Sequence, residues 1–197
     1  MLRKSIIALS LMAVPLTMLA VASSASAAPA KVHTHKFTGS ISCSLTGTIT
    51  AKPGLLLSTA RTVKITVRTT LTGCTGNTTE DGATITGGSG SATITGSYSC
   101  TSLTTSAPDP SGEVMWTTTG NNASPTKFTT NTGTFTMGPP VMISYDTTQT
   151  ESFTGTGSLS AKVHQHFSTL ASRCSRTEGL KTINLSSGTM SFSPSAS

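Results

Sequence analysis

The chain has 197 residues, with 13 Lys and Arg against seven Asp and Glu and a single Trp beside two Tyr. The basic residues are scattered and few aromatic side chains accompany them, a pattern that argues against nucleic-acid binding. Threonine, serine and glycine dominate, whereas the helix-forming residues Glu, Lys and Leu are scarce, so the composition favours β-structure.

The N-terminal segment has the order of a secretory signal peptide. A basic start leads into an apolar run from Ser5 to Val21, and small residues follow up to Ala27, where cleavage is expected. The run is shorter and more interrupted than a spanning helix, which needs about 20 apolar residues. We therefore predict a signal peptide over residues 1–27 and one domain over residues 28–197. The mature protein is expected to be secreted, without membrane insertion after cleavage.

Alternation of apolar and polar residues predicts many short strands. Such segments lie, in chain order, at 41–45, 63–71, 83–86, 92–98, 113–117, 128–137, 141–145 and 153–163. Residues 87–90, Gly-Gly-Ser-Gly, are expected to form a hairpin turn, and residues 182–192 a closing hairpin. One short helix is expected near residues 167–176. The pattern predicts an all-β fold, with an immunoglobulin-like β-sandwich of about 8–10 strands as the leading architecture. Trp116 is expected in its core.

The even number of cysteines in an exported chain predicts two disulfides. Four cysteines allow three connectivities, and the preferred pairing is Cys74 with Cys100 and Cys43 with Cys174. The first bridge would close a loop around the glycine-rich turn, and the second would tie the first core strand to the segment before the last hairpin.

The histidines occur in two similar short motifs, His33-Thr-His35 and His164-Gln-His166. In a strand, residues i and i+2 share a face, so each pair could offer two imidazoles to a Zn, Cu or Ni ion. Against a four-histidine site, the two motifs have opposite phase relative to their apolar neighbours, and no acidic residue adjoins either pair. The alternative is that these are surface histidines.

The remaining chemical motifs are weak. No G-x-S-x-G sequence is present, and the seven acidic residues suggest no convincing catalytic pair. The sequence therefore predicts no catalytic residues, no enzyme activity and no cofactor, apart from the metal alternative.

Four segments, at residues 41–50, 71–76, 98–103 and 174–192, contain all four cysteines in low-complexity Thr, Ser and Gly surroundings. In these segments the chain resembles a group of functionally uncharacterised proteins exported by actinobacteria. The resemblance implies a secreted all-β protein with disulfides, and it transfers no catalytic residues.

The leading functional hypothesis is a non-catalytic structural or binding protein of the cell envelope or the extracellular space, with an unknown partner there. Two alternatives stay open: a secreted metal-binding protein that uses the histidine pairs, and an extracellular hydrolase whose site is assembled from distant residues.

Overall fold

The computed structural model describes residues 39–76, 84–105, 110–120, 123–136, 140–151 and 155–194. The predicted signal peptide lies outside these residues. Within them the chain forms eight strands and two short helices. The strands are β1 (Ile41–Leu55), β2 (Arg61–Thr75), β3 (Thr84–Tyr98), β4 (Ser111–Thr119), β5 (Thr126–Thr136), β6 (Met142–Glu151), β7 (Gly155–Val163) and β8 (Leu180–Pro194). Helix α1 (Ser102–Thr105) follows β3, and α2 (Phe167–Cys174) follows β7.

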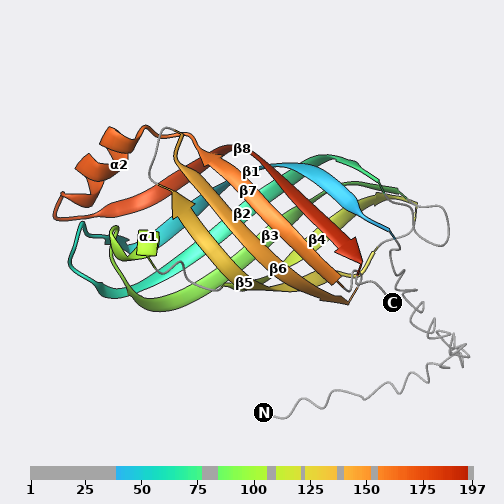
Figure 1. The fold of residues 1–197 in the computed structure, drawn as a ribbon, viewed down its shortest axis with the longest axis horizontal. Helices are drawn as coiled ribbons and strands as arrows, with labels where there is room; N and C mark the ends of the chain where they lie inside the picture. Colours follow the sequence, from blue (N-terminus) through green and yellow to red (C-terminus); the bar gives the residue numbers. More distant parts are fainter. Residues whose placement is uncertain are drawn as a thin grey trace, which may run out of the picture. The chain divides into compact units, whose positions relative to one another are not determined.

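The strands close into one antiparallel barrel (Figure 1). Each strand pairs with its neighbours in the sequence, and β8 returns to pair with β1, where Ile41 lies opposite Phe192 and Leu55 opposite Leu180. Closure gives the first and last strands a partner on both sides, so they are no longer sheet edges. The all-β class and the helix near residues 167–176 are confirmed. The immunoglobulin-like β-sandwich is wrong, because a single sheet curls onto itself instead of two sheets stacking.

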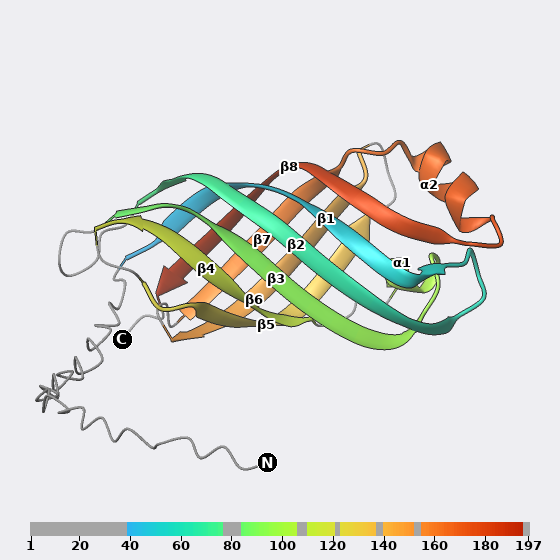
Figure 2. The same ribbon diagram turned by 180° about the vertical axis from the view of Figure 1, so that it is seen from behind.

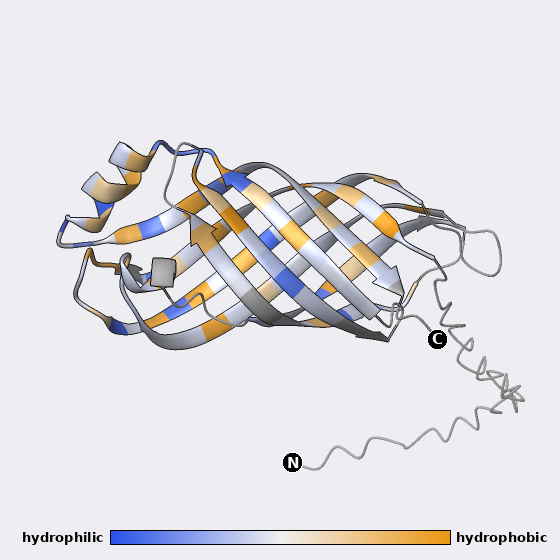
Figure 3. Cartoon of the chain, in the orientation of Figure 1, coloured by the Kyte–Doolittle hydropathy of each residue, from blue (hydrophilic) through white to orange (hydrophobic). Residues whose placement is uncertain are grey.

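The alternating pattern separates the inside of the barrel from the outside. On β1 and β2, residues such as Ile41, Leu45, Val63 and Leu71 are buried, and the polar residues between them are mostly exposed. Figure 3 shows this alternation of apolar and hydrophilic residues along the strands. Among the described residues, no helix is long and apolar enough to cross a membrane.

Both predicted hairpins at the glycine-rich segments are wrong, because β3 and β8 each run through as one strand. A Cβ atom added to Gly87 would lie 2.6 Å from the carbonyl oxygen of Leu71, and one added to Gly188 would lie 2.4 Å from that of Ser160. Real Cβ atoms do not approach so closely. The glycines therefore mark close approaches between neighbouring strands and not turns.

Large buried side chains occupy the interior toward the end of the barrel where β1 begins and β8 ends. Phe192 is 1% exposed, and its ring meets that of Trp116 edge to face with centroids 5.5 Å apart. The indole Nε1 of Trp116 donates a hydrogen bond of 2.7 Å to Oγ1 of Thr126, which is itself fully buried. The expected core role of Trp116 is confirmed.

The disulfides join Cys43 to Cys74 and Cys100 to Cys174, so the predicted pairing of Cys74 with Cys100 and Cys43 with Cys174 is wrong. Cys74 pairs with Cys43 because the register between β1 and β2 shifts next to it. At this shift β2 has one residue more than β1, and Gly73 there has φ 57°, a conformation that suits glycine. The additional residue shifts the inward and outward alternation, so that Cys74 lies on the same side as the buried Leu71. Cys74 thereby lies beside the buried Cys43, with the two Cα atoms 4.0 Å apart.

Candidate ligand-binding site

The half of the barrel toward the two helices contains an apolar cavity of about 40 Å³, which we call the chamber. Its walls come from six of the strands, β1, β2, β3, β5, β6 and β8, and from the segment between β3 and β4. Most lining side chains are aliphatic, among them Ile49, Ala51, Ile65, Ile94, Ile143 and Ile183. The rings of Phe135 and Tyr145 and the side chain of Lys181 also line the chamber. A space for one water molecule needs about 10–15 Å³, so the chamber has room for a small group. Its walls are mostly apolar, which favours the uptake of apolar matter over water.

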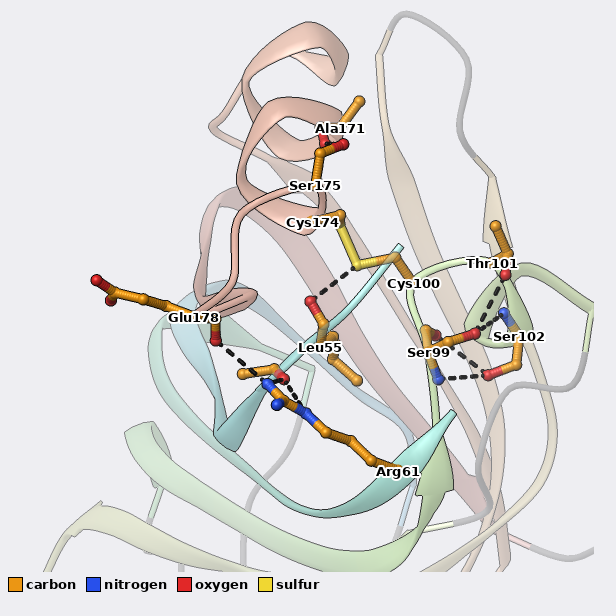
Figure 4. Close-up of a disulfide and its surroundings, with 11 residues drawn as sticks. Leu55, Arg61, Ser99, Cys100, Thr101, Ser102, Ala171, Cys174, Ser175 and Glu178 are labelled. Carbon is orange, nitrogen blue, oxygen red and sulfur yellow. Dashed lines mark hydrogen bonds between the residues drawn. A yellow bond between two sulfur atoms is a disulfide. The ribbon is translucent and has the colours of Figure 1, made fainter. Parts of the chain in front are cut away.

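The two helices close this end of the barrel (Figure 1). Leu170 of α2 is 1% exposed and packs with Leu55, Leu103 and Leu180 around a smaller space of about 10 Å³. The Cys100–Cys174 disulfide fastens the C-terminal end of α2 to the segment that leads into α1 (Figure 4). We call α1 and α2 together the cap. The disulfide joins the two parts of the cap covalently at the end of the barrel that holds the chamber.

An arginine links the strands beneath the cap to the turn that follows α2 (Figure 4). The Arg61 guanidinium donates hydrogen bonds to the carbonyl oxygen of Gly54, with Nε at 2.8 Å, and to that of Glu178 at 3.2 Å. Lys181 Nζ lies 2.7 Å from the Glu178 carboxylate, and this hydrogen bond holds the pKa of Glu178 below its ordinary value. The Lys181 and Glu178 side chains are exposed, so this ion pair lies at the solvent side of the chamber, which Lys181 also lines.

One side of the chamber is closed without a complete ladder of strands. The β3–β4 ladder ends at Thr93 and Ser111, whereas β3 continues to Tyr98. Among the described residues, the β4–β5 ladder has four residue pairs and ends where Ser111 meets Thr129. Beyond that point Thr130 N donates to the carbonyl oxygen of Pro110 at 3.2 Å.

Residues of the β3–β4 connection close this part of the wall. Leu103 of α1 and the buried Pro110 both line the chamber, and α1 packs against β5. The segment before α1 is attached to the β1–β2 turn, because the backbone N–H groups of Cys100 and Thr101 donate to the carbonyl oxygens of Leu56 and Leu57. The wall between β3 and β5 thus depends on a four-residue helix instead of a strand.

Of the predicted metal ligands, the two that the structure describes lie outside the strands. His164 and His166 are exposed and lie between β7 and α2, where the His164 N–H donates to the carbonyl oxygen of Asn184 and His166 is the N-cap residue of α2. Val163 at the end of β7 is buried, whereas Phe167 is 47% exposed because it lies on α2, where the alternation of a strand does not apply. His33 and His35 lie outside the described residues. Within the described part of the chain, no group of three or more His, Cys, Asp or Glu could hold a metal ion.

Sequence reasoning missed the chamber. The alternating pattern marks Ile65, Ile94 and Ile143 as inward-facing, but it carries no signal that the inward side chains leave space between them.

Comparison with known proteins yields no match. No protein family, no curated protein and no solved structure is significantly similar to this chain. The resemblance to exported actinobacterial proteins stays a prediction.

Proposed function

We propose that this is a secreted, non-catalytic binding protein that holds a small apolar molecule, or an apolar branch of a larger one, in the chamber. The observation that carries the proposal is a mostly aliphatic cavity inside a closed eight-stranded barrel. Barrels of this size are wide enough to enclose one small ligand. Burial of an apolar ligand against aliphatic walls is favourable at about 25 cal/mol per Å².

The size of the chamber restricts the ligand. About 40 Å³ is well below the roughly 150 Å³ of an engineered protein cavity that takes up benzene or xenon. We expect a ligand larger than a few atoms to displace Leu103, because this side chain lies on the shortest helix and lines both the chamber and the space under α2. The wall that α1 closes is then the route by which the ligand enters.

Two features support secretion. The N-terminal segment has the order of a signal peptide, and both disulfides require an oxidising compartment to form and persist. Within the described residues all four cysteines are oxidised.

The test is uptake of inert apolar probes, followed by NMR of the isoleucine methyl groups in the purified protein. We expect xenon to shift the methyl signals of Ile65, Ile94 and Ile143. Leu103→Ala should enlarge the chamber and allow benzene to bind, since truncating a leucine leaves a cavity that the surroundings fill only in part. Ala51→Leu should fill the chamber and abolish xenon binding.

Leu57→Ala is the matched control, because Leu57 is 43% exposed on the β1–β2 turn and does not line the chamber. Its xenon response should equal that of the unmodified chain. If xenon leaves these methyl signals unchanged and benzene fails to bind to folded Leu103→Ala, the chamber is not a binding site.

A further inference from the structure

A second feature lies on the outside of the barrel, on the strands β1 and β2. Lys52, Lys64 and Arg68 line a groove of about 450 Å³ together with three threonines, Thr48, Thr50 and Thr66. The three basic side chains are exposed, and the threonines are half-buried between them. We call this the basic groove. Figure 2 shows the face of the barrel on which β2 and the neighbouring β3 cross in front.

The register brings like charges together. Lys52 lies directly opposite Lys64 across the β1–β2 ladder. Two like charges in such a position destabilise a sheet, so the sequence maintains an unfavourable pair here. Arg68 follows Lys64 on the same face of β2, about 14 Å further along the strand at roughly 3.4 Å per residue.

The surroundings do not neutralise these charges. On the β8 side, the residues paired with Thr48 and Thr50 are Asn184 and Thr182. On the β3 side, the residues paired with Lys64, Thr66 and Arg68 are Thr95, Thr93 and Ser91. None of the three basic residues forms an ion pair with a carboxylate among the described residues.

We propose that the basic groove binds a linear polyanion that carries phosphate or sulfate groups. The arginine can hold an oxyanion with two parallel hydrogen bonds, and the lysines act as point charges. The threonine hydroxyls can donate to further oxyanion oxygens. Lys64 and Arg68 lie along one strand, so a chain that carries several anionic groups can contact both of them. A bound polyanion would also relieve the repulsion between Lys52 and Lys64. This proposal concerns the outer face and does not depend on the chamber.

The experiment measures the affinity of the purified protein for polyphosphate, for dextran sulfate and for neutral dextran at low salt. The two polyanions distinguish phosphate from sulfate recognition, and neutral dextran controls for the sugar backbone. The groove variant is Lys52→Gln/Lys64→Gln/Arg68→Gln. The control variant, Lys162→Gln/Arg173→Gln/Arg176→Gln, removes the same charge from exposed positions on β7 and around α2.

We expect at least one polyanion to bind, and neutral dextran not to bind. The groove variant should lose about tenfold or more in affinity and become less sensitive to salt, because fewer counterions are released. The control variant should lose less than about threefold, as long-range charge alone contributes little at separate positions. Thermal unfolding verifies that both variants are folded. Equal losses in the two variants, binding of neutral dextran as tight as that of dextran sulfate, or no binding of either polyanion would overturn the proposal.

Discussion

Replacing Cys100 and Cys174 together by alanine is expected to lower the free energy of unfolding by about 4 kcal/mol. The two cysteines are 74 residues apart in the sequence. Cross-linking a loop of that length removes about 4.5 kcal/mol of chain entropy from the unfolded state on the loop-closure estimate. Urea unfolding followed by circular dichroism measures the change.

The second disulfide provides the comparison. Cys43 and Cys74 are 31 residues apart, so the same estimate gives about 3.7 kcal/mol for their double alanine variant. The two double variants should therefore differ little in stability but clearly in xenon binding. Only the Cys100–Cys174 bridge fixes the two helices at the end of the barrel that holds the chamber. A Cys100→Ala/Cys174→Ala protein that loses less than about 1 kcal/mol would contradict a structural role for this bridge.

Phe192→Ala is expected to destabilise the barrel by about 3–5 kcal/mol, the usual range for a fully buried phenylalanine. Phe192 is 1% exposed, and its removal also ends the edge-to-face contact with Trp116. It lies on β8 opposite Ile41 of β1, at the pairing that closes the barrel. The loss should therefore appear as a lower urea midpoint together with a change in tryptophan fluorescence.

Phe167→Ala is the matched control for Phe192→Ala. The Phe167 side chain is 47% exposed at the start of α2, so its removal should change stability by no more than about 0.5 kcal/mol. If both variants lose a similar free energy of unfolding, Phe192 does not have the buried position in the barrel interior that the structure gives it.

The inward faces of the strands could be predicted from the sequence, but their connection into a barrel could not. Ile41, Val63 and Ile143 are buried as the alternation indicates. The same alternation suits a sandwich and a barrel, because both have one apolar and one polar face. What distinguishes them is the pairing of β1 with β8, a contact between opposite ends of the domain that no local pattern encodes.

Glycine residues account for the wrongly predicted hairpin turns and for the wrongly predicted partner of Cys74. A run of glycines is typical of a turn, but Gly87 and Gly90 lie inside β3, where Leu71 and Thr69 of β2 leave no room for a side chain. At Gly73 the opposite happened, because a single residue with positive φ shifted the alternation and brought Cys74 to Cys43. Both effects depend on which strand lies alongside.

The chamber could not be predicted from the sequence, because it also depends on how the strands lie beside one another. A cavity is a difference between the volume that the strands enclose and the volume that their side chains fill. Ala51 lies opposite Ile65 on the neighbouring strand, and only the curvature of the closed sheet decides whether their side chains reach those across the barrel. The basic residues of the groove appear scattered in the sequence, since the register and not their spacing brings Lys52 beside Lys64.

The most direct test of the account is a crystal structure of the protein determined under xenon pressure. We predict one eight-stranded barrel closed by β1 and β8, with xenon between Ile65, Ile94 and Ile143 in the chamber beneath α1 and α2. Two separate stacked sheets, or a closed barrel whose interior takes up no xenon, would contradict it.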